Sequence, residues 1–334
     1  MFLFRKSLFC ALAFACASAV AQTPLKVKVF PGAQNLPLFA AQAQGYFARQ
    51  GLKVEILFTR DSQEQRDGLA KGEFQIAHAA VDNAVAMVER AKQDVVIVLG
   101  GDSSMNELFV QPDIGSVKEL RGHTLVVDAP DTAYALQLKK VLLMNGLKEG
   151  ADYTIKPVGG TLLRLKAMLE DKQMKAAMLN APFSVDAKSA GLKSLGRAID
   201  LIGPYQASGA FVQRSWAKDN AATLERYIAA YVEGMRWTLA PANRAEGAKL
   251  LTERLKLKPE VAERTMELLS EPKFGFATDA RFNVRGFRNV LALRAEIEGD
   301  WGGKAPRAAR YYDLSYYKKA IKHLDSAATS SGRR

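Results

Sequence analysis

Apolar and polar residues follow two kinds of pattern in the first third of the chain. Residues 25–30 (LKVKVF) alternate with the period of two of a half-buried strand, and residues 95–99 (VVIVL) form the unbroken apolar run of a strand buried on both faces. Between them the patterns predict three helices and two strands, at residues 38–50, 62–71, 82–92, 53–58 and 74–77. Alternating strands and helices predict a mainly parallel sheet covered by crossover helices.

The same alternation starts again in the middle of the chain. It predicts strands and helices in turn, at residues 124–127, 133–144, 153–158, 161–170 and 176–179. Two turn-rich segments, 107–113 and 202–209, are the expected crossovers between the two units. The sequence therefore predicts an α/β fold of two lobes connected by two crossovers, with residues 22–108 and 204–334 in the first lobe and 109–203 in the second.

The last third of the chain is predicted to be mostly helical. Apolar residues recur at helical spacing in five segments, at 221–239, 244–255, 259–269, 284–297 and 316–324. Pro259 suits the first turn of its helix, where its missing N–H has no partner to lose. We expect these extra C-terminal helices to pack on the first lobe.

The first 21 residues have the pattern of a secretory signal peptide. Arg5 and Lys6 precede an apolar run too short to span a bilayer, and Ala19 and Ala21 supply the small side chains that a signal peptidase recognises. We expect cleavage after Ala21 and export to the periplasm. An alternative is a lipid-modified start at Cys16, since an alanine precedes it.

Composition excludes several other classes of protein. Both cysteines of the chain, Cys10 and Cys16, lie in the signal, so the exported protein has no disulfide and no cysteine nucleophile. The net charge of +12 comes from scattered lysines and arginines, with no basic block interleaved with aromatics, so no nucleic-acid partner is expected. The three histidines are dispersed, and no metalloprotease or serine-hydrolase motif occurs. We expect no catalytic residues, metal or cofactor.

Several short motifs resemble one known family along nearly the whole exported chain. They are residues 35–40 (NLPLFA), 45–47 (GYF), 51–54 (GLKV), 120–122 (LRG), 145–147 (NGL), 181–183 (APF) and 312–316 (YDLSY). The sequence resembles periplasmic binding proteins of ABC importers of the nitrate, sulfonate, taurine and thiamine-precursor type. The resemblance implies two α/β lobes that close over a ligand in the cleft between them.

Candidate ligand-binding residues follow the predicted strands, because ligands of open parallel sheets sit outside the carboxyl ends of the strands. The candidates are Gln34, Asn35, His78, Asp128, Asp131, Thr132, Asn180 and Phe183. Some have a structural alternative. Asp131 and Thr132 could each cap the next helix, and Phe183 could belong to the core, as could His78.

Departures from the family pattern bear on the ligand. Relatives that bind anions have a loop rich in Ser, Gly and Thr after the first strand of the second lobe, and here that loop is residues 128–132 (DAPDT). Pro130 removes an N–H donor, and Asp128 and Asp131 add negative charge. Asn180 stands where relatives often have Trp. The resemblance therefore implies a ligand that carries hydrogen-bond donors, such as an amine or a heterocycle, rather than a simple sulfonate or nitrate.

The sequence leaves three functions open. The first is the solute-binding component of an ABC importer, a monomer that binds a small organic molecule and docks on an inner-membrane permease. The second is an enzyme of thiamine-precursor type on the same fold. The third is a receptor that senses the solute without transporting it.

Overall fold

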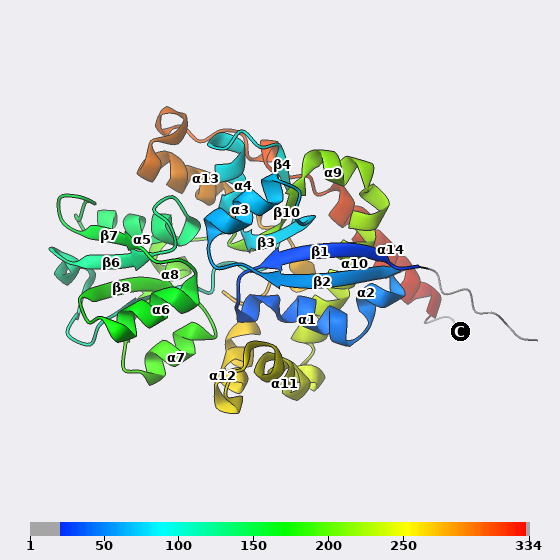
Figure 1. Ribbon diagram of the computed structural model, residues 1–334, viewed down its shortest axis with the longest axis horizontal. Coiled ribbons are helices and arrows are strands. Elements are labelled where there is room, and N and C mark those ends of the chain that lie inside the picture. The colour runs from blue at the N-terminus through cyan, green and yellow to red at the C-terminus, as the bar shows by residue number, and fades with distance from the viewer. Residues whose placement is uncertain (1–20, 332–334) are drawn as a thin grey trace, which may run out of the picture.

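The computed structural model describes residues 21–331 of the 334-residue chain as two α/β lobes. The predicted signal segment lies outside the described residues, apart from Ala21. Figure 1 shows one lobe, built around β6–β8, beside a larger lobe that holds both ends of the described chain. The predicted fold class is thereby confirmed.

The first lobe is built on a mixed sheet with strand order β2-β1-β3-β10-β4. Its strands are β1 (Thr23–Val29), β2 (Leu52–Phe58), β3 (Ile76–Ala80), β4 (Val95–Leu99) and β10 (Ser208–Gln213). The helices between the first four are α1 (Leu36–Ala43), α2 (Tyr46–Arg49), α3 (Ser62–Ala70) and α4 (Asp82–Glu89). β1 pairs in parallel with β2 and β3, whereas β10 runs antiparallel between β3 and β4.

The second lobe repeats this arrangement, with strand order β7-β6-β8-β5-β9. Its strands are β5 (Glu107–Val110), β6 (Thr124–Val127), β7 (Thr154–Pro157), β8 (Met174–Leu179) and β9 (Lys193–Arg197). Its helices are α5 (Ala133–Met144), α6 (Thr161–Glu170), α7 (Phe183–Ser189) and α8 (Ala198–Ile202). β5 is the antiparallel strand here, lying between β8 and β9. In each sheet, the antiparallel strand is thus the first strand that the chain forms after it crosses from the other lobe.

The two expected crossover segments contain strands that sequence patterns did not predict. β5 begins at Glu107, a charged residue that is buried because Lys188 and Ser194 bind its carboxylate. β10 contains Gly209, and glycine in a sequence usually indicates a turn. Here the glycine lets β10 pack closely against β4, because a Cβ at this position would lie 2.5 Å from the Leu99 carbonyl oxygen. The chain therefore passes between the lobes at residues 100–106 and 203–207.

The C-terminal helices are α9 (Arg214–Asp219), α10 (Ala221–Leu239), α11 (Arg244–Leu255), α12 (Pro259–Leu269), α13 (Val284–Glu298) and α14 (Ser315–Ser331). They cover both faces of the first-lobe sheet: α13 lies on the side of α4, whereas α10, α11, α12 and α14 lie on the side of α1 (Figure 1). α10 buries one face against α1, where Gly234 lets the helices approach: a Cβ there would lie 2.2 Å from the Pro37 carbonyl oxygen. Among the described residues, no helix is both long and apolar enough to cross a bilayer.

Two of these helices also touch the second lobe. α13 packs against α5, and α12 packs against α7. The α13–α5 contact includes two ion pairs, from Glu296 to Lys140 at 2.5 Å and from Glu298 to Lys139 at 3.0 Å. Helices α13 and α12 therefore connect the two lobes at two separate places.

Candidate functional site: a pocket between the lobes

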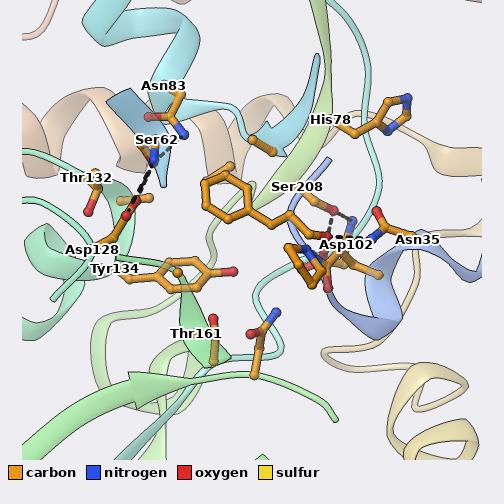
Figure 2. A pocket seen from close by; sticks show the side chains of 18 of the residues that line it. Asn35, Ser62, His78, Asn83, Asp102, Asp128, Thr132, Tyr134, Thr161 and Ser208 are labelled. Atoms are coloured by element: carbon orange, nitrogen blue, oxygen red, sulfur yellow. Dashed lines mark hydrogen bonds between the residues drawn. The ribbon is translucent and has the colours of Figure 1, made fainter. Parts of the chain in front are cut away.

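A pocket lies between the two lobes where strands of both sheets end. It offers about 60 Å³ to the centres of water-sized molecules, several times the ~10–15 Å³ that one water needs. β1, β3 and β4 bring their carboxyl ends to it from one lobe, and β6 and β8 from the other. Its polar lining residues are Gln34, Asn35, Ser62, His78, Asn83, Asp102, Asp128, Thr132, Tyr134, Thr161, Arg164, Asn180, Ser208 and Tyr231 (Figure 2).

Six of the eight candidate residues line this pocket: Gln34, Asn35, His78, Asp128, Thr132 and Asn180. Two of them direct polar atoms to their own loops. The Asn35 amide donates to the carbonyl oxygens of Phe30 at 2.6 Å and Gly32 at 3.1 Å. The Thr132 hydroxyl donates to the Ala129 carbonyl oxygen at 2.9 Å. These two residues shape the walls of the pocket.

Asp131 and Phe183 are not among the lining residues. The Asp131 carboxylate accepts hydrogen bonds from Arg66 and Arg90, each at 3.3 Å. Burial alone would raise the pKa of Asp131, but Arg66, Arg294 and Arg90 hold it below its ordinary value. Phe183 is the first residue of α7 and is buried in an apolar cluster with Phe109. Asp131 is held by two arginines and Phe183 packs in an apolar core, so we leave both residues out of the candidate site.

Three charged side chains line the pocket without forming an ion pair among residues 21–331. Asp102 accepts hydrogen bonds from the Ser208 hydroxyl and the Ser104 N–H. Asp128 accepts from the hydroxyl and N–H of Ser62, which belongs to the other lobe. Burial raises the pKa of both carboxyls despite these bonds.

Arg164 is the cation of the pocket and is almost fully buried. Its guanidinium donates to the carbonyl oxygens of Met178 at 3.2 Å and Gly159 at 2.9 Å, and to the Thr161 hydroxyl at 2.8 Å. The guanidinium carbon, Cζ, lies 5.2 Å from the centroid of the Tyr134 ring. All these partners belong to the second lobe, so Arg164 fixes the shape of that wall.

His78 is a neutral imidazole in this setting. Its Nε2 lies 2.8 Å from the Tyr227 hydroxyl oxygen, and its ring centroid lies 4.9 Å from that of Tyr231. Burial lowers the pKa of His78 to about 3. A buried histidine with no neighbouring carboxylate can exchange hydrogen bonds with a solute, but it is poorly suited to accept a proton near neutral pH.

The pocket also holds polar atoms with no partner in the described part of the chain. The side chain of Asn180 makes no hydrogen bond to residues 21–331, and the same is true of the buried oxygens Gln34 Oε1 and Asn83 Oδ1. A buried polar atom without a partner costs free energy, which a bound molecule or water recovers. The pocket can therefore bind a small solute through amide donors and acceptors.

Sequence patterns missed several lining residues. Asn83, in the first turn of α4, and Asp102, which follows β4, both come after predicted strands, yet neither was chosen as a candidate. Arg164 is inside a helix, and Tyr231 is on α10, almost 100 residues after the second-lobe loop at 128–132. No local pattern distinguishes such residues from ordinary helix positions. No group of described residues could hold a metal ion.

The fold and pocket define a class of protein, the two-lobed periplasmic-binding-protein fold. A structure from Bordetella bronchiseptica RB50 has a TM-score of 0.79 and 20% identity, over 91% of this chain and 99% of that one. The periplasmic nitrate-binding protein NrtA from Synechocystis PCC 6803 has a TM-score of 0.75 and 14% identity, over 91% of this chain and 89% of that one.

The alkanesulfonate-binding protein SsuA from Xanthomonas axonopodis pv. citri, bound to MOPS, has a TM-score of 0.69 and 15% identity, over 89% of this chain and 97% of that one. No curated protein matches the sequence. The model of the NMT1-like family matches residues 18–252, and this chain belongs to that family. The resemblance predicted from the short motifs is confirmed.

Proposed function

We propose that this protein is the solute-binding component of an ABC-type importer and that it captures a small organic molecule between its lobes. The observation that carries this proposal is the pocket itself. Both lobes contribute polar groups to it, and some of these groups, such as the Asn180 amide, have no partner among residues 21–331. A molecule bound there would contact both lobes at once and hold them together.

The similar structures support the same function. One is a nitrate-binding protein, another binds an alkanesulfonate, and a third is the ligand-binding component of an ABC-type import system from Staphylococcus aureus. In our proposal, the chain is exported to the periplasm after cleavage behind Ala21, works as a monomer, and delivers its solute to an inner-membrane permease. Intact-mass measurement of periplasmic protein tests the first step, and a lipid-modified start at Cys16 would contradict it.

Binding is better supported than catalysis at this site. The only histidine of the pocket has its pKa lowered to about 3, so it does not exchange protons readily near neutral pH. Asp102 and Asp128 are each held by serine donors. The lining therefore offers recognition groups rather than an acid–base pair.

A thermal-shift screen tests the proposed function. The mature protein is heated with sulfonates, carboxylates, pyrimidines and amines in separate wells. A solute at 100 times its dissociation constant stabilises the folded state by about 2.7 kcal/mol, which a melting curve detects readily. An Asn180→Ala variant is the matched control, since the shift should shrink when a pocket group is removed. A complete absence of shifts across all classes would contradict solute capture.

A further inference from the structure

The N-terminus of helix α3 is capped from across the pocket. Its own N-cap residue, Asp61, accepts a hydrogen bond from the Glu64 N–H at 2.8 Å. A second carboxylate, Asp128 of the opposite lobe, accepts from the Ser62 N–H at 3.4 Å and from the Ser62 hydroxyl. Figure 2 shows this contact at one side of the pocket. Two carboxylates therefore meet the first turn of a single helix.

The contact is part of a short chain of hydrogen bonds. The Asn83 side-chain amide donates to the Ser62 Oγ at 3.2 Å, and Ser62 in turn donates to Asp128. Asn83 and Ser62 belong to the first lobe and Asp128 to the second, and all three line the pocket. Because Asn83 and Asp128 lie in different lobes, this series of hydrogen bonds can form only when the lobes are in contact.

A helix N-terminus is a favourable place for negative charge, because its free N–H groups and its dipole both attract an anion. Here the carboxylate of Asp128 occupies the position at the N-terminus of α3 where an anion would bind. Asp128 is 8% exposed, and it forms no ion pair with any described residue. An oxyanion entering this side of the pocket would meet the negative charge of Asp128, with Asp61 nearby, instead of free donors.

The nearest cation does not reverse this balance. Arg164 acts on Asp128 electrostatically, but three of its five N–H groups bind Met178, Gly159 and Thr161 in its own lobe. The other acid of the pocket, Asp102, adds further acceptor oxygens. The side of the pocket near α3 is thus suited to a group that donates hydrogen bonds.

We propose that Asp128 is the residue that determines the charge of the accepted solute. It replaces a bound anion at the N-terminus of α3, holds the two lobes together there, and excludes sulfonates, carboxylates and nitrate. The solute accepted by the pocket is neutral or cationic and presents nitrogen donors. This inference rests on the proposed function as a solute-binding protein.

The test compares the mature wild type with Asp128→Ala and Asp128→Asn, using methanesulfonate and nitrate as probes in calorimetric titrations. Removing the carboxylate frees the donors of α3, so the affinity for methanesulfonate should rise at least tenfold in Asp128→Ala. Asp128→Asn removes the charge while keeping the shape, and its affinity for methanesulfonate should rise as well. Asp131→Asn is the matched control, because Asp131 is in the same loop but outside the pocket; it should leave the affinity unchanged.

A second readout needs no solute. If Asp128 holds the lobes together, the radius of gyration of the solute-free protein should increase in Asp128→Ala and in Ser62→Ala. Tighter binding of methanesulfonate by the wild type than by both Asp128 variants would overturn the inference, and such a result would still support solute capture. Equal anion affinity in all variants would overturn it as well. Failure of every solute in the thermal-shift screen would instead count against the proposed function.

Discussion

Two of the regions where the lobes meet differ in how their polar groups are partnered. Outside the pocket, Arg294 of α13 is fully buried against Asp82, with N–O distances of 2.9 and 2.8 Å. The same guanidinium binds Asp300 at 3.3 Å and donates to the Asp131 carbonyl oxygen of the second lobe at 2.8 Å. Inside the pocket, by contrast, the side-chain amide of Asn180 and the side-chain oxygens of Gln34 and Asn83 have no partner in residues 21–331.

This difference separates structural polar groups from groups available for binding. A buried charge is tolerated only when it is paired and its hydrogen bonds are satisfied, as they are around Arg294. An unpartnered amide at the edge of a cavity is acceptable when a solute or water completes its hydrogen bonds. The first region should therefore respond to mutation with a loss of stability, and the second with a loss of affinity.

The largest effect is expected at the buried ion pair. Arg294→Met should lower the free energy of unfolding by about 3–5 kcal/mol, because it leaves the Asp82 carboxylate buried without its partner. Urea denaturation measures the loss. The exposed pair of Lys166 and Glu170, 3.6 Å apart, provides the control, and Glu170→Gln should cost no more than about 0.5 kcal/mol. Equal losses in the two variants would remove the distinction between buried and exposed pairs.

The next effect is a dependence of stability on pH at His78. The folded-state pKa of about 3 lies below the ordinary value of 6.5, so the unfolded chain takes up the proton first. The contribution to stability is present above pH 6.5 and is lost as the pH falls toward 3. Between pH 7 and pH 5 the loss amounts to about 2 kcal/mol, at 1.36 kcal/mol per pKa unit.

Melting curves of the wild type and of His78→Gln at these two pH values isolate this part of the pH dependence, since glutamine does not titrate. The difference in stability between the two proteins should shift by about 2 kcal/mol toward the variant as the pH falls from 7 to 5. Parallel curves at both pH values would mean that His78 is not held neutral by burial.

Two asparagines that line the pocket should respond differently to mutation. Asn180→Ala removes an unpartnered amide, so it should weaken binding of the solute found by screening by about 0.5–1.5 kcal/mol, roughly twofold to tenfold in Kd. Asn35→Ala removes two bonds to its own loop and should mainly lower the melting temperature. Calorimetry and melting curves on both variants check the contrast, which fails if the two residues exchange effects.

Much of the fold follows from local patterns in the sequence. The buried run of β4 and the alternating residues of β1 give clear periods, and the glycines after predicted helices mark their ends. The predicted helix over 38–50 is two helices, α1 and α2, which meet at Gly45 with a φ of 70°. β5 and β10 were missed because each depends on distant partners: Glu107 on Lys188, and Gly209 on the backbone of Leu99.

The pocket is only partly visible in the sequence for the same reason. Residues that directly follow strands, such as Asp128 and Asn180, could be found from the rule that ligands bind at the carboxyl ends of parallel strands. That rule also selected Asp131, since sequence spacing does not tell whether a side chain faces the pocket or the arginines behind it. Ser62 gains its role from a residue 66 positions away, which only the folded structure brings together.

Solute binding between the lobes can be seen directly in a crystal structure of the mature protein with the solute selected by the thermal-shift screen. We expect one molecule in the pocket, within hydrogen-bond distance of Asn180 and Asn83, with the Ser62–Asp128 contact formed beside it. A solute bound elsewhere on the surface, with the pocket left to water, would contradict it.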